Sequence, residues 1–447
     1  MEGFLNLSNL NNILDLANKN IVLLYIKMSQ LSSFKKASNP DMVYYDIVST
    51  NYQSTSTEEP FLRFNETRTN PIIPNSGDYY LSIVRFSLDT YNLPNLICEI
   101  QPNQGDPNLS IYSITLELQD GVGGFTPSQQ IFLDWIPQNQ FINTPIPPNQ
   151  TNNGFQVSSQ YYYCYQFQYF LSLINIAFGQ ALASLVANTG GGASPINTAI
   201  QPIMTWDTTS DSAILQAESA NYDNKVTTNR INIFFNPPLF ALFNSFPSLN
   251  YGIVPTARNT FGRNYQLPIV DYTGVQTILL PTNPVPPQTQ EVYTQIFQEF
   301  STIDTWTPVN SIVFVSNTIP IVSNQLSAPL VFNNGQTSSG IGNNANFAQI
   351  ITDMATNQQV FKPNILYSPT AEYRRIDMTG NTPLNNIDIN VYWRSKLGEL
   401  VPFVLASGAT ASIKFLFERK HLFDSSKGKD EVDNGHPKSI SDRKWGV

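Results

Sequence analysis

Histidine is nearly absent from this sequence. The 447-residue chain has two, His421 and His436, and both follow Lys420. A Ser–His–Asp or Cys–His catalytic arrangement needs an imidazole beside the nucleophile, and His-ligated metals need it as a ligand. We therefore expect no such catalytic residues and no metal ligands of this kind in the body of the chain.

Cysteine and long apolar runs are also scarce. Cys98 and Cys164 are the only cysteines, too few for a structural metal site, and we expect reduced, partly buried thiols; a disulfide between them is the alternative. The apolar run Ile21–Ile26 is too short to span a bilayer, and no small-residue cleavage site follows it. We therefore expect no membrane span, and we expect the protein to assemble inside the cell. The glycosylation sequon Asn65-Glu66-Thr67 then carries little weight.

Charge is sparse as well. Charged residues are 13% of the chain, against the usual ~25%, and the net charge is −9. This balance argues against nucleic-acid binding by the whole protein, although Lys19, Lys27, Lys35 and Lys36 make the first segment mildly basic. Neutral polar residues and 31 prolines stand in for the charges. Such a surface is cheaper to desolvate and suits protein–protein contact; a solvated, Asn-rich β-protein is the alternative.

Motifs for chemistry are weak. Asp207 and Asp211 are four residues apart, and Glu58 and Glu59 are adjacent in a predicted loop. A glycosidase needs two carboxylates about 5–9.5 Å apart across a cleft, whereas these residues are more typical of turn or cap hydrogen bonds. Gly190–Gly192 has no following lysine, so we interpret it as a linker and not as a phosphate-binding loop. We predict a protein that is not an enzyme and needs no cofactor.

Two groups of residues would suit recognition. Arg374-Arg375 could bind phosphate or an acid of a neighbouring subunit, and a charge at a strand edge is the alternative interpretation. Trp135 and Trp206 would provide exposed aromatic rings if the chain were a carbohydrate- or receptor-binding module.

The stretch Asn386–Lys420 shows the clearest β pattern. Ile387, Ile389, Val391 and Trp393 alternate with polar residues, which predicts a half-buried strand. A turn with Gly398 at positive φ, a returning strand and a third strand would follow. We therefore expect three antiparallel strands at the end of the ordered chain.

Further strands and one long helix are predicted upstream. In Ser110–Leu118 the apolar residues should face the core, while Ser113, Thr115 and Glu117 face out. Apolar residues from Phe167 to Leu185 recur at three and four, which predicts a helix that ends before Thr189–Ala193. The other strands are expected at Met42–Ser49, Asp78–Leu88 (with a bulge), Arg230–Phe235 and Thr305–Ser316, and a loop at Phe332–Asn346.

Several of these stretches together resemble the penton, or minor capsid, proteins of virophages and polinton-like double-stranded DNA viruses. The resemblance covers most of residues 42–420, and Val391-Tyr392-Trp393, Gly398, Gly408, Ile413-Lys414 and Phe417 carry it best. It implies an antiparallel jelly-roll β-sandwich that forms pentamers at icosahedral vertices of the virion and contacts trimeric major capsid protein. It carries over no catalytic, cofactor-binding or metal-binding residues.

A single jelly roll is shorter than this chain, so the resemblance implies an insertion. We expect an arm at 1–41, whose residues 1–27 are an upstream extension or a mobile arm, and a disordered charged tail at 421–447. The jelly roll would comprise 42–108 and 301–420, and 109–300 would be an inserted domain that projects from the vertex and could touch a host receptor.

Three alternatives stay open. The chain could be a double jelly-roll major capsid protein that forms trimers. It could be a carbohydrate- or receptor-binding β-sandwich module, or an enzyme that acts on glycosides with an Asp or Glu pair.

Overall fold

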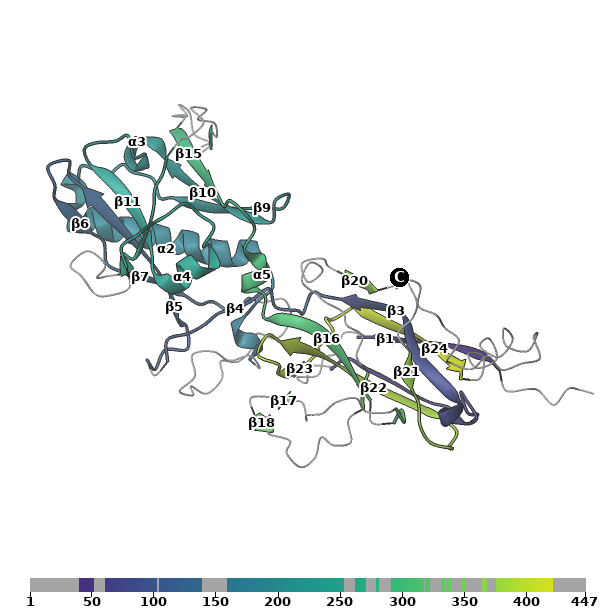
Figure 1. Ribbon diagram of the computed structural model, residues 1–447. Helices are drawn as coiled ribbons and strands as arrows, with labels where there is room; N and C mark the ends of the chain where they lie inside the picture. The colour runs from purple at the N-terminus through teal and green to yellow at the C-terminus, as the bar shows by residue number, and fades with distance from the viewer. Residues whose placement is uncertain are drawn as a thin grey trace, which may run out of the picture.

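A computed structural model describes most of the 447-residue chain. The described residues are 40–51, 61–102, 104–138, 159–252, 262–270, 279–280, 291–316, 318–321, 331–333, 336–338, 348–350, 364–367 and 375–420. The predicted tail, nearly all of the predicted arm, Glu58, Glu59, Arg374 and both histidines lie outside them. Figure 1 shows two parts, a β-sandwich built from the two ends of the chain and a central segment that contains the long helix α2.

One sheet of the sandwich has five strands. Its order is β1 (Met42–Thr50), β24 (Thr410–Arg419), β3 (Tyr79–Asp89) and β20 (Asn364–Tyr367), and β21 (Ile376–Asp377) also pairs with β3; η1 (Ser76–Asp78) precedes β3. All pairs are antiparallel. The register of β3 against β24 shifts between Lys414 and Phe415, which confirms the predicted bulge in β3. The last strand of the chain therefore lies between two of the first.

The second sheet has seven strands. They are β2 (Arg63–Thr67), β16 (Val309–Ser316), β17 (Val331–Asn333), β18 (Gln336–Ser338), β19 (Ala348–Ile350), β22 (Asn386–Ser395) and β23 (Leu400–Pro402). β22 is central, because β2 and β23 pair with one side of it and β16 with the other. The alternating residues of β22 are buried as predicted, and Gly398 has a φ of 88° in the turn that follows.

The strand order identifies the sandwich as a jelly roll. The chain passes back and forth between sheets ordered β1-β24-β3-β20 and β2-β22-β16-β19, as two interlocked Greek keys require. Apolar side chains of both sheets fill the space between them, for example Phe86 and Phe314, whose rings lie edge to face at 4.7 Å. The predicted fold class, mainly β with an antiparallel jelly roll, is confirmed.

The central segment contains two further sheets and most of the helices. A six-stranded sheet comprises β5 (Leu109–Gln119), β6 (Phe125–Pro127), β7 (Ile131–Asp134), β11 (Arg230–Phe235), β12 (Leu249–Asn250) and β13 (Tyr265–Leu267). A four-stranded sheet comprises β9 (Ile203–Asp207), β10 (Ser212–Glu218), β14 (Leu279–Leu280) and β15 (Glu291–Phe297). The short elements are β4 (Leu96–Ile97), η2 (Gln160–Tyr162), β8 (Tyr163–Cys164), η3 (Gly191–Ala193), α3 (Ser219–Tyr222), α4 (Pro237–Leu242) and α5 (Ile303–Trp306).

Helix α2 (Phe167–Asn188) is the core of the central segment. It packs on β5 and β7 from one sheet and on β9 from the other. By length and composition α2 could cross a bilayer, but half of its most apolar stretch is buried inside the protein. It ends as predicted, where the Thr189 hydroxyl donates to the Leu185 carbonyl at 2.8 Å and Gly190 takes a φ of 115°.

Three expectations about strands are wrong. Thr305 and Trp306 belong to α5, so the strand begins only at Val309. Part of the loop expected at 332–346 pairs as β17 and β18. The three final strands do not form one meander, because β24 crosses to the other sheet after the turn at Gly408. Alternation marks a buried face, but it does not say which sheet provides the partner.

The sandwich and the central segment meet where the chain passes between them. β4 follows β3 and pairs with β8, and α5 leads back into β16. Trp393 of the sandwich, 1% exposed, contacts the ring of Tyr163 of the central segment edge to face at 6.1 Å. The two parts therefore share buried aromatic contacts at this joint.

Candidate assembly surface

The carboxylates considered for catalysis have structural roles. Asp207 accepts hydrogen bonds from the Ser210 hydroxyl at 2.7 Å and the Thr209 backbone N–H at 2.9 Å, and these bonds lower the pKa of its carboxyl. Asp211 closes the same turn with a φ of 49°. The turn interpretation of Asp207 is confirmed.

The two tryptophans are not exposed platforms. Trp135 is 1% exposed, and its Nε1–H donates to the Tyr161 carbonyl at 2.7 Å. Trp206 is half-buried and stacks on the ring of Phe167 with 4.3 Å between centroids. The expectation of exposed rings is wrong for Trp135, because an indole packs best where both its carbon surface and its N–H find partners.

The remaining sequence candidates also point to structure. Arg375 donates from Nε to Glu418 at 3.1 Å, an ion pair within its own sheet. Cys98 and Cys164 are buried free thiols, as predicted, and burial raises the pKa of both. Among the described residues, no three His, Cys, Asp or Glu side chains gather as metal ligands would. Gly190 lies between α2 and η3, and Gly191 and Gly192 belong to η3.

The sequence pattern did not predict one buried ion pair. Glu117 on β5 was expected to face solvent, but it is 0% exposed and forms an ion pair with Arg263. Ser113 and Thr115 on the same strand are also buried, against the same expectation. Asn232 of β11 donates to Glu117 at 3.4 Å and accepts from Gln266 of β13 at 3.0 Å. A buried charge is tolerated only with such partners. They come from distant strands, so alternation within β5 gave no sign of them.

The outer face of the five-stranded sheet carries an unusual number of exposed apolar side chains. Tyr44 and Val48 of β1 are 54% and 61% exposed, and Leu366 of β20 is 64% exposed. With Met42, these residues frame a polar centre and define the assembly surface. Among the described strands β1 pairs only with β24, so its other edge is open.

The charged side chains in the centre of the assembly surface have partners. Arg85 donates to Asp46 at 2.8 Å, and the Lys414 ammonium lies 5.4 Å from the centre of the Tyr44 ring. A face with apolar margins, few unpaired charges and an open strand edge favours contact with another protein. It offers no cleft or nucleophile for catalysis.

The fold and this surface define a jelly-roll protein of the class that builds viral capsids. Residues 43–419 match the family model for the Sputnik minor capsid protein V18/19. The chain belongs to that family and is a structural protein of the virion capsid.

Related proteins agree with this assignment. The chain is 36% identical over 168 residues to the uncharacterized protein V18 of Sputnik virophage, covering 37% of this chain and 97% of V18. It is 29% identical over 224 residues to the structural protein V19 of the same virophage, covering 48% of this chain and 94% of V19.

Two solved structures share the fold. A chain in the cryo-EM structure of the Sputnik virophage aligns with a TM-score of 0.64 and 29% identity, over 86% of this chain and 99% of the other. The crystal structure of the mavirus penton protein aligns with a TM-score of 0.51 and 16% identity, over 85% of this chain and all of the other. The second likeness concerns the fold alone.

Proposed function

We propose that this chain is the penton protein of its capsid, forming pentamers at the icosahedral vertices and contacting the major capsid protein. The apolar, open-edged assembly surface of the jelly roll carries this proposal. Family membership and the likeness in fold to the mavirus penton protein support it. A trimeric hexon-like subunit remains the rival.

The proposal assigns different roles to different parts of the chain. Residues 42–108 and 301–420 would form the capsid shell, and 109–300 would project outward as an inserted domain. β3 and β16 lie in the sandwich, while β5–β7 and β9–β15 form two sheets that contain no sandwich strand. The short strand β4, within 42–108, pairs with β8 of the insertion. The chain would have no enzymatic activity and no specific nucleic-acid binding, and its net charge of −9 supports the second point.

The oligomeric state tests this function. We expect native mass spectrometry and negative-stain images of the purified full chain to show pentameric rings. Trimers would select the hexon-like alternative, and a monomer that never enters particles when co-expressed with major capsid protein would contradict both.

Matched valine substitutions test the surface. Val48→Lys should abolish pentamers and leave the monomer folded, because Val48 is already 61% exposed on β1. Val122→Lys is the control, since Val122 is 92% exposed on a turn of the central segment. Equal assembly by both variants, measured by native mass spectrometry, would remove β1 from the interface.

A further inference from the structure

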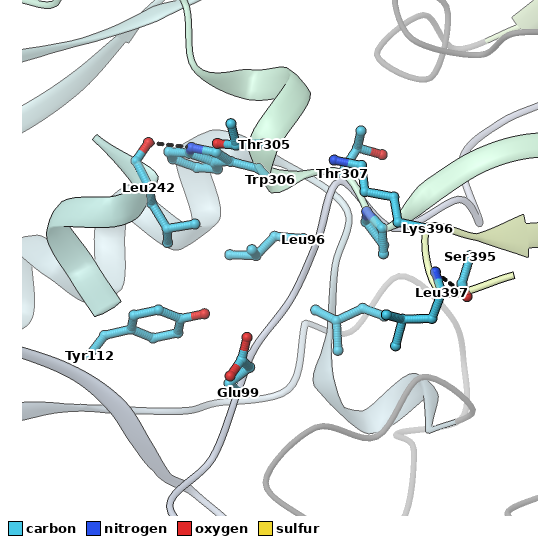
Figure 2. Close-up of a pocket in the computed structure, with 12 residues that line it drawn as sticks. Leu96, Glu99, Tyr112, Leu242, Thr305, Trp306, Thr307, Ser395, Lys396 and Leu397 are labelled. Atoms are coloured by element: carbon cyan, nitrogen blue, oxygen red, sulfur yellow. Dashed lines mark hydrogen bonds between the residues drawn. The ribbon is translucent and has the colours of Figure 1, made fainter. Parts of the chain in front are cut away.

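A cavity of about 340 Å³ lies at the joint between the sandwich and the central segment. Five separate stretches of chain provide its lining residues, and they meet around it in Figure 2. They are the segment after β4, strand β5, the helices α4 and α5, and the turn between β22 and β23. Its volume lies within the range of roughly 300–1,000 Å³ that is typical of small-molecule sites.

Most of the cavity wall is apolar and rigid. Leu96, Leu242, Leu397 and the rings of Tyr112 and Trp306 line it. Trp306 is 3% exposed, and its Nε1–H donates to the Leu242 carbonyl. The Phe243 ring meets Trp306 edge to face at 4.9 Å. The indole therefore presents a fixed surface, and Leu397, at 67% exposure, marks the open side.

Glu99 is the exception in this apolar wall. Its side chain lies between Tyr112 and Leu397 (Figure 2), and it has no cation or hydrogen-bond donor as a partner among the described residues. Burial raises the pKa of this carboxyl. Lys396, the ammonium among the lining residues, instead donates to the Asp304 backbone carbonyl. The cavity thus contains a partly desolvated carboxylate that lacks a counter-ion.

We propose that this cavity binds a small organic cation with an apolar body. Its ammonium would pair with Glu99, and its body would lie against Trp306, Tyr112 and Leu397. A cation beside aromatic faces and a carboxylate gains both cation–π and charge-assisted hydrogen-bond energy, and the apolar wall would cover much of the rest of the molecule.

Three probes that share a 2-phenylethyl group but differ in charge test the proposal on the full chain. Isothermal titration calorimetry would compare 2-phenylethylammonium, neutral 2-phenylethanol and anionic 3-phenylpropionate. We expect saturable one-to-one binding of the cation, about tenfold tighter than the alcohol and tighter still than the anion. Absence of saturable binding by all three, or tighter binding of the anion, would overturn the proposal.

Variants locate the charge that is recognised. Glu99→Gln should reduce cation affinity to that of the alcohol and leave alcohol binding unchanged. Asp89→Asn is the matched control, because burial also raises the pKa of Asp89 but this residue lies outside the cavity. Leu397→Ala should weaken all three probes. If Glu99→Gln left the ratio of cation affinity to alcohol affinity unchanged, the pairing with Glu99 would be refuted. If a variant fails to fold, the order of probe affinities on the unmodified chain still decides the proposal.

Discussion

At the scale of single residues, Trp393 links the two parts of the molecule. It is 1% exposed on β22 and touches Tyr163 across the joint. Trp393→Ala should lower the free energy of unfolding by about 3–5 kcal/mol, because a buried aromatic side chain leaves a cavity when it is truncated. Urea denaturation followed by circular dichroism measures this change, with Tyr44→Ala as the exposed control. Equal stability of the two variants would mean that the Trp393 ring is not packed.

Buried ionisable residues give a second prediction at this scale. Burial raises the pKa of Tyr162, Tyr169 and Cys164 to about 12. The folded state therefore holds these protons more tightly than the unfolded state, whose tyrosines and thiols titrate near ~10 and ~8.5. This contribution to stability is present below the unfolded values and is lost as the pH rises toward 12.

An alkaline titration tests whether burial raises these pKa values and whether stability falls as the pH rises. The phenolate absorbance contributed by Tyr162 and Tyr169 should appear only near pH 12, which difference titrations of Tyr162→Phe and Tyr169→Phe against the unmodified protein would show. Cys164 should react with a thiol reagent only in denaturant. Stability that is flat across this alkaline range would contradict the pKa shifts.

The residues also show what local pattern can predict. The buried face of β22 was predictable because alternation is a property of consecutive residues. The burial of Glu117 was not, since its partner Arg263 lies 146 residues away. Trp135 was mistaken for an exposed ring for the same reason, because its acceptor is on another element.

At the scale of elements, the polar network across β5, β11 and β13 gives a third prediction. Glu117→Ala should destabilise the protein by about 3–5 kcal/mol, because it leaves the Arg263 guanidinium buried without its carboxylate. The double variant Glu117→Leu with Arg263→Met should lose much less stability, because it leaves no buried charge unpaired. Thermal or urea unfolding measures both, and additive losses would show that the two side chains are not coupled.

Strands were easier to locate than to pair. The predicted strand at 230–235 and the long helix from Phe167 agree closely with β11 and α2, since each has a strong period of its own. The placement of β24 depends on partners such as Thr50, which is 360 residues from Thr410. No local signal carries that information. The joint cavity was equally unpredictable, because five distant stretches build it.

At the scale of the whole molecule, the sandwich depends on its last strand. β24 pairs with both β1 and β3. A chain that stops after Leu405 should therefore fail to form the five-stranded sheet, while a chain that stops after Lys420 should keep it. Far-UV circular dichroism and solubility distinguish the two. A soluble, β-rich product from the shorter chain would show that β1 and β3 need no bridge.

The position of β24 has a consequence for biosynthesis. A ribosome releases β1 among the first described strands, and β24 is the last of them to emerge. Among the described strands, β24 is the one that pairs with β1 and its part of the assembly surface, so a chain interrupted before β24 lacks this support. If the assembly surface is the contact proposed above, only a chain whose synthesis has passed β24 would present it to a growing shell.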